Sequence, residues 1–120
     1  MSTTVLQDLR AALRLIRSPA RWCRGAFALD ARGGAVEVDD PYACRRCAAA
    51  ALAMVTKRTV FDVASTKAYH ALEHAVVALF PYDPETADLD PLEWVNDHFT
   101  HVDVVRVFQR AIRDQRSLAR

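Results

Sequence analysis

The chain has 120 residues, of which 52% are hydrophobic, 8% aromatic and 26% charged, and this composition excludes a disordered chain. We therefore expect a single folded domain over residues 1–120, with a core rich in Ala, Val and Leu. A net charge of +1 gives the whole molecule no field that would direct it to nucleic acid or to an anionic membrane. No apolar run is long enough to span a membrane, and the first residues lack a signal-peptide pattern, so we expect a cytoplasmic protein without membrane association.

The charges are nevertheless segregated along the chain. Residues 1–24 and residues 104–120 each carry five Arg and one Asp, whereas residues 25–103 carry six basic and thirteen acidic residues. This pattern has two interpretations: the basic ends pack against the acidic middle of the same chain, or they form a basic face for an acidic protein surface or a nucleic acid. The candidate residues of this face are Arg10, Arg14, Arg17, Arg106, Arg110 and Arg113.

Helix start signals recur along the chain, either as capping boxes or as Asp-Pro pairs, and each precedes a stretch with helical spacing of apolar residues. The acidic, proline-containing segment 81–90 is expected to be a loop. The signals predict helices over about 5–17, from Asp40-Pro41 to about Thr56, up to about Phe80, and from Thr100 onward, with a short helical turn from Pro91 to Trp94.

Two short alternating segments, residues 26–30 and 35–38, flank a glycine-containing turn and predict a β-hairpin. Two strands alone are only marginally stable in water, so we expect the hairpin to place apolar side chains such as Phe27 against helices. The expected fold is therefore α+β and mostly helical, with about four principal helices packed with one small β-hairpin.

The cysteines and histidines supply one candidate metal site. Three cysteines are too few for a disulfide framework, so we expect thiols or metal ligands. A Cys-x-x-Cys pair and two histidines four residues apart provide ligand types and local spacings that zinc uses, so zinc is a possible ligand although no cofactor is predicted. The alternative is that the histidines face solvent and the cysteines pack as small apolar residues. The candidate ligands are Cys44, Cys47, His70 and His74.

A nucleophilic site is the other catalytic possibility. Cys47 with an imidazole from His98 or His101 would supply a thiol and a base. The alternative is that residues 96–100 end one helix and cap the next. No glycine-rich phosphate loop is present, which argues against a nucleotide-binding fold of that type.

The chain contains three short motifs, Trp22-x-x-Gly25-Ala26-Phe27, Cys47-x-x-Ala50-Ala51-Leu52 and Trp94-x-Asn96-Asp97. Together they resemble a family of small bacterial and phage proteins of unknown function. In that family glycine stands where this chain has Ala50. The resemblance implies a shared fold but assigns no activity, cofactor or catalytic residue. The candidate packing anchors or pocket residues are Trp22, Gly25, Cys47, Trp94, Asn96 and Asp97.

The sequence contains no recognisable set of catalytic residues, whereas its basic and acidic residues are segregated along the chain. The leading prediction is therefore a non-catalytic binding or regulatory module. A thiol- or zinc-dependent site and a nucleic-acid-binding arginine face are the two alternatives.

Overall fold

The computed structural model describes residues 3–118, in which five α-helices pack with a two-stranded antiparallel sheet. The mostly helical α+β fold is confirmed, with five helices rather than four because the short turn predicted after Asp90 continues as a helix to His98. The elements are α1 (Val5–Ile16), η1 (Pro19–Arg21), β1 (Ala28–Leu29), β2 (Arg45–Arg46), α2 (Ala48–Thr56), η2 (Val63–Ser65), α3 (Lys67–Leu79), α4 (Pro91–His98) and α5 (His101–Leu118).

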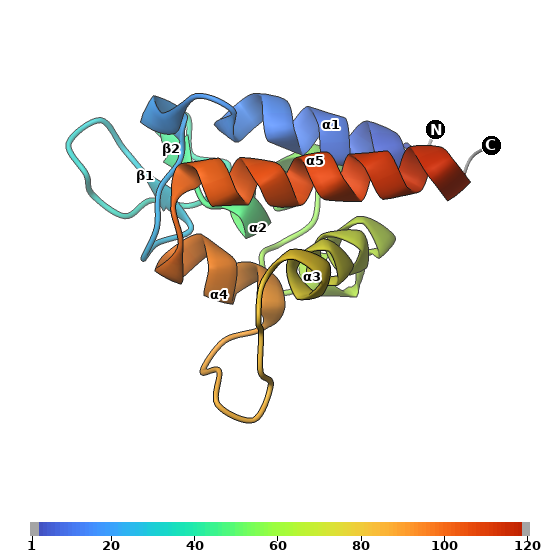
Figure 1. The fold of residues 1–120 in the computed structure, drawn as a ribbon. Helices are drawn as coiled ribbons and strands as arrows, with labels where there is room; N and C mark the ends of the chain where they lie inside the picture. The colour runs from blue at the N-terminus through green and yellow to red at the C-terminus, as the bar shows by residue number, and fades with distance from the viewer. Residues whose placement is uncertain (1–2, 119–120) are drawn as a thin grey trace.

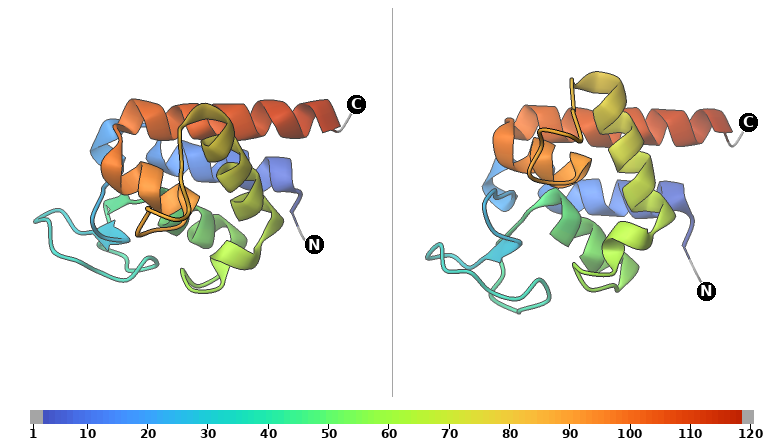
Figure 2. Two further views of the ribbon diagram at one scale, coloured as in Figure 1. Left: turned by 60° about the horizontal axis from the view of Figure 1, so that its bottom comes forward. Right: turned by 90° about the horizontal axis from the view of Figure 1, so that it is seen from below.

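The two terminal helices form one layer of the molecule. α1 and α5 run antiparallel and side by side, so the start of α1 and the end of α5 lie at the same end (Figures 1 and 2). α2 packs against α1, α3 against α5, and α4 against α3. The small sheet lies at the end opposite the termini, next to the start of α2 (Figure 2).

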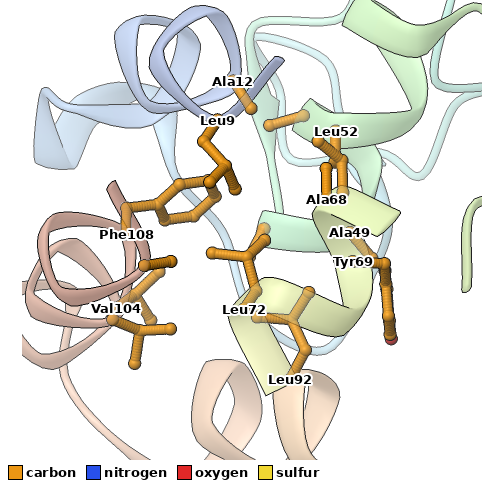
Figure 3. Packing of buried hydrophobic residues seen from close by; sticks show 14 of the residues in the cluster. Leu9, Ala12, Ala49, Leu52, Ala68, Tyr69, Leu72, Leu92, Val104 and Phe108 are labelled. Atoms are coloured by element: carbon orange, nitrogen blue, oxygen red, sulfur yellow. The ribbon is translucent and has the colours of Figure 1, made fainter. Parts of the chain in front are cut away.

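The core forms where α1, α2, α3 and α5 meet. The side chain of Phe108 points toward Leu9 of α1 and Leu72 of α3, and all three are fully buried (Figure 3). In α2 the alanine block 48–53, interrupted only by Leu52, is buried on every side. Small side chains let neighbouring helices approach this helix closely, which explains how a chain with few aromatic residues fills its core.

The predicted hairpin is formed only in part. Residues 35–38 meet the first segment at the antiparallel Leu29–Ala35 bridge and through the Val36 N–H, which donates to the Ala28 carbonyl. The two-stranded sheet itself pairs β1 with β2, so Ala28 lies opposite Arg46. The pairing with β2 is extended at both ends, because the Cys44 and Cys47 N–H groups donate to the carbonyls of Leu29 and Phe27. Among the apolar side chains of the two predicted strands, Val38 packs against the helical core, while 40% of Phe27 remains exposed.

The predicted start of the second helix is also wrong. Asp40 accepts a hydrogen bond from the Tyr42 N–H at 2.7 Å and thus closes a turn instead of capping a helix. The following residues, Arg45 and Arg46, are extended because they pair with β1, so α2 begins only at Ala48. The predicted end of this helix at Thr56 is confirmed.

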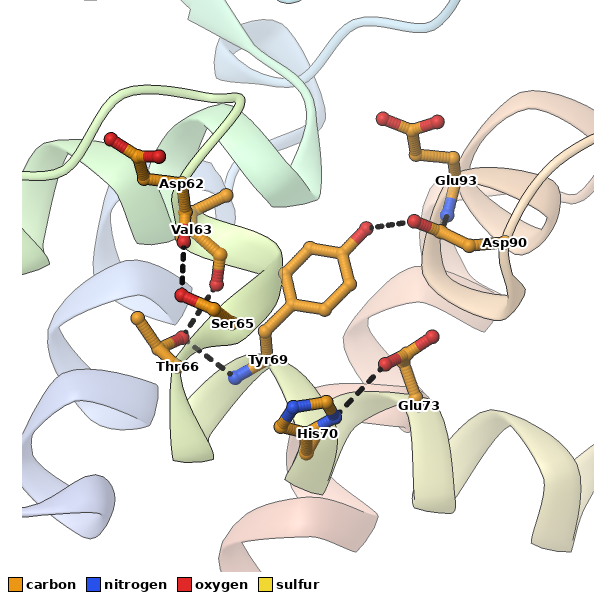
Figure 4. Close-up of polar contacts among 9 residues, drawn as sticks. All are labelled: Asp62, Val63, Ser65, Thr66, Tyr69, His70, Glu73, Asp90 and Glu93. Carbon is orange, nitrogen blue, oxygen red and sulfur yellow. Dashed lines mark hydrogen bonds and ion pairs between the residues drawn. The ribbon is translucent and has the colours of Figure 1, made fainter.

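The contact between α3 and α4 depends on a buried phenol. The Tyr69 hydroxyl donates a 2.6 Å hydrogen bond to Oδ2 of Asp90, whose Oδ1 caps α4 by accepting from the Glu93 N–H (Figure 4). Burial and the neighbouring Asp90 carboxylate raise the pKa of Tyr69 well above its usual range, so the phenol remains a donor.

No helix among the described residues is long and apolar enough to cross a membrane.

Replacement of Phe108 by Ala tests the placement of the core. We expect Phe108→Ala to lower the free energy of unfolding by about 3–5 kcal/mol, because it leaves a cavity between three helices. Val102→Ala on the same helix changes an exposed side chain and should cost less than about 0.5 kcal/mol. Urea denaturation of both variants measures the difference, and equal losses would contradict the assigned core.

Candidate functional site

Asn96 of α4 is a buried amide, 2% exposed, that joins three separate segments of the chain. Its Oδ1 accepts hydrogen bonds from Trp22 Nε1 at 2.8 Å and from the Ala48 N–H at 3.0 Å. Its Nδ2 donates to the Cys23 carbonyl at 3.1 Å and to Oδ1 of Asp97 at 3.3 Å. Both sides of the amide are therefore fully used, and a flipped amide would face two donors with its own N–H groups.

The sheet brings the first two sequence motifs next to each other. β2 pairs with β1 on one side and with the segment at Trp22 on the other, where the Cys23 N–H donates to the Arg46 carbonyl at 3.2 Å. Cys47 follows β2 directly, so the Trp-x-x-Gly segment and the Cys motif become neighbours. Asn96 of the third motif then bonds to both.

A cavity of about 400 Å³ lies beside Asn96, between α4, the start of α2 and the segment 25–36. Its walls are largely apolar and include Phe27 and Val36. Gly25 enters this segment with a φ of +77°, a conformation that residues with a side chain rarely adopt, and its N–H donates to Asp97 Oδ1 at 3.2 Å. The cavity has the size of a small-ligand site.

Cys47 lines this cavity as a protonated thiol. It is the N-cap of α2, and its sulfur accepts a hydrogen bond from the Ala50 N–H at 3.4 Å. Burial raises the pKa of Cys47 to about 12, an effect larger than the opposing effect of the helix N–H groups. Burial also raises the pKa of Cys23, whose thiol donates to the Ala26 carbonyl. Neither thiol has the environment of an activated nucleophile.

Two carboxylates supply the charge of the cavity. Glu93 and Asp97 lie four residues apart on α4, and both line the cavity. Burial raises the pKa of Glu93, as do the charges of Asp90 and Asp97. Within residues 3–118 neither carboxylate forms an ion pair, and in Figure 4 the Glu93 carboxylate reaches none of the polar groups drawn with it.

The predicted anchor residues separate into two groups. Gly25, Cys47, Asn96 and Asp97 line the cavity, and Trp22 is bonded to Asn96. Trp94 does not belong to this site, because it packs edge-on against other aromatic rings. The rings in contact with it are those of Tyr82 and Phe99.

Two cavity residues, Phe27 and Glu93, are absent from the sequence-based candidates. Glu93 was detectable in principle, because a helix continuing past Trp94 places it on the same face as Asp97. Phe27 follows Gly25-Ala26 in the first motif, which was the signal that could have added it to the candidates.

The catalytic set predicted from Cys47, His98 and His101 is not assembled. His98 Nε2 lies 3.6 Å from Oδ1 of Asp88 in the preceding loop. His101 Nε2 donates to the Ile16 carbonyl at 2.7 Å, and its ring packs against Trp22 at 5.5 Å. In the described part of the chain neither histidine hydrogen-bonds to Cys47, so no base is positioned at this thiol.

The four predicted zinc ligands do not come together. Cys47 lines the cavity beside Asn96, while Cys44 is exposed and donates to the Tyr42 carbonyl. His70 and His74 lie in a shallow depression between α3 and the end of α5, and His70 pairs with Glu73 at 3.3 Å (Figure 4). Over residues 3–118 no group of three His, Cys, Asp or Glu side chains is placed to hold a metal ion.

The predicted basic face is partly assembled, as a groove between α1 and α5. Arg10, Arg14, Arg17 and Arg113 line it together with Arg116, which the sequence-based set omitted. The two other predicted members do not line it. Arg106 lies over the Phe80 ring and near Asp103, and Arg110 pairs with Asp114 at 3.1 Å.

A comparison with models of protein families identifies the family of this chain. The model of a family of unknown function, DUF6197, matches residues 1–114. The chain belongs to DUF6197. Membership in a family of unknown function, as the three motifs suggested, is thereby confirmed. No curated protein matches the chain, and no solved structure matches it.

Removal of the Asn96 amide tests its role in this DUF6197 chain. We expect Asn96→Ala to lower the free energy of unfolding by about 3 kcal/mol, because the Trp22, Ala48 and Cys23 groups lose their partner at a buried position. Gln109→Ala changes an exposed amide and should cost less than about 0.5 kcal/mol. Chemical denaturation measures both, and a loss below about 1 kcal/mol for Asn96→Ala would contradict the role.

Thiol titration tests the burial of the cysteines. In the folded protein at pH 8 we expect only Cys44 to react rapidly with a chromogenic disulfide, and all three thiols after denaturation. Cys44→Ser should abolish the rapid phase. A second rapid thiol would contradict this assignment.

The free energy of unfolding should fall as the pH rises above about 9, because the unfolded thiol then ionises while folded Cys47 keeps its proton up to a pKa of about 12.

Proposed function

We propose that the protein is a non-catalytic binding module that holds a small cationic ligand in the cavity beside Asn96. One observation carries the proposal: three motif segments, far apart in the sequence, surround one cavity of about 400 Å³ that contains two carboxylates without an ion-pair partner in residues 3–118. Sites of this size usually combine apolar walls with a few convergent polar groups.

The chemistry of the cavity favours an ammonium group on an apolar body. Glu93 and Asp97 attract a positive charge, while Phe27 and Val36 provide apolar contact area. The raised pKa of Glu93 reflects burial and repulsion from two neighbouring carboxylates, and a bound cation would offset that repulsion. An anionic ligand would add to the repulsion and is disfavoured.

The thiol environment supports a binding role over a catalytic one. A thiol whose pKa is raised to about 12 is almost entirely protonated near neutral pH, whereas the nucleophile in thiol catalysis is the thiolate. Cys47 then acts as a cap of α2 and as part of the cavity wall.

Titration with 2-phenylethylamine tests this proposal, with the neutral 2-phenylethanol and the anionic 3-phenylpropanoate as controls of similar shape. We expect amide NMR shifts at Gly25, Phe27 and Asp97 with the amine alone. Glu93→Gln should weaken amine binding about tenfold, because it removes one charge at a partly buried site. The affinity should increase as the pH rises through the titration of Glu93, because the carboxylate binds the cation.

The matched control is Glu85→Gln, which removes a carboxylate from the exposed loop after α3 and should leave amine binding unchanged. Equal binding of the three probes, or an equal effect of the two substitutions, would show that the carboxylates of the cavity do not select a cation. Absence of any shift at the cavity residues would overturn the site.

A further inference from the structure

The groove between α1 and α5 is a second site candidate, distinct from the cavity beside Asn96. It has a volume of about 380 Å³, and its lining contains five arginines and no acidic residue. α1 contributes Arg10 and Arg14, its C-cap contributes Arg17, and α5 contributes Arg113 and Arg116. Because the two helices are antiparallel neighbours (Figure 1), arginines from both of them line one groove.

The arginines of the groove have few acidic partners. Among residues 3–118, no ion pair and no side-chain hydrogen bond involves Arg10, Arg14, Arg17 or Arg116. Arg113 has Asp114 at 3.9 Å, but that carboxylate lies closer to Arg110, at 3.1 Å. All five groove arginines are exposed. Like charges are thus gathered and accessible, an arrangement that favours an anion in the groove.

A packing explanation accounts less well for this arrangement. Amphipathic helices commonly carry solvated charges on their outer face. Elsewhere on α5 the pairs Arg106–Asp103 and Arg110–Asp114 show this usual mixture of signs. The groove lacks such a mixture.

The lining of the groove favours a phosphate polymer over an acidic protein. Its apolar floor consists of Leu13 and Ile112, and no aromatic side chain lines it, whereas protein interfaces are enriched in aromatic residues. Guanidinium groups bind phosphate oxygens through paired hydrogen bonds. Arg10 of α1 and Arg17, the C-cap of this helix, are seven residues apart, so their row extends over roughly 10 Å. A nucleic-acid strand advances about 3.4 Å per nucleotide, so about three phosphates fit along the row.

We propose that this groove binds the sugar-phosphate backbone of a nucleic acid. With no aromatic residue to stack on bases, recognition is independent of base sequence and depends on salt concentration. This site is independent of the cationic ligand proposed for the cavity, and either proposal can fail without the other.

Fluorescence anisotropy with a labelled 20-nucleotide DNA, as a single strand and as a duplex, tests the proposal on the full chain. Arg14→Gln/Arg113→Gln should weaken binding at least tenfold at about 50 mM salt and reduce the slope of log affinity against log salt by about two. Arg32→Gln/Arg58→Gln removes the same charge at exposed positions outside the groove, and its affinity should stay within twofold of the parent. Thermal unfolding verifies that each variant is folded, because Gln is nearly as good a helix former as Arg.

Each of four outcomes would overturn the proposal, the last of them a strong sequence preference. The first is absence of DNA binding at low salt. The second is an equal loss in the two double variants, which would indicate a response to net charge alone. The third is tighter binding of poly-glutamate than of DNA by the parent protein, which would identify an acidic protein partner instead. Equal affinity for oligonucleotides of different sequence is expected, and strong sequence preference would contradict backbone recognition.

Discussion

The buried amide of Asn96 is the contact on which the arrangement of the functional segments depends. It joins Trp22 and the Cys23 carbonyl, which are more than 70 residues away in sequence, to the N-terminus of α2. Each of these groups would be costly to leave unpaired at a buried position, so the amide selects one mutual arrangement of the segments. A sheet of two-residue strands would not be stable by itself, and this network, together with the packing of α2, keeps it in place.

The structure also shows where the segregated basic and acidic residues lie in the fold. Among residues 3–118 the Arg106–Asp103 contact is the one ion pair between a basic end of the chain and its acidic middle. The ion pairs that the terminal arginines make within residues 3–118 all lie inside α5. Instead the two terminal helices pack on each other through buried apolar faces and leave arginines in the groove between them. The acidic middle contributes Glu93 and Asp97 to the cavity, so the molecule presents two regions of opposite charge.

Signals that act over a few residues were predicted well. The capping box of Thr4 and Gln7, the Asp90-Pro91 start of α4 and the ends of α2 and α3 were all correct, because caps and prolines act on neighbouring backbone groups. The Asp40-Pro41 pair failed because the same residues also form turns. Which of the two forms occurs was decided by the pairing of β1 with Arg45 and Arg46, a contact between distant segments.

The sequence by itself thus predicted the mostly helical fold and membership in a family of unknown function, since local pattern carries both. Only the tertiary structure decided which motif residues share a cavity, which arginines share a groove and which cysteines are buried. Trp94 and Asn96 are two residues apart, yet one packs among aromatic rings and the other bonds to Trp22. The two faces of a helix meet different neighbours, and those neighbours are set by packing between elements that are far apart in the chain.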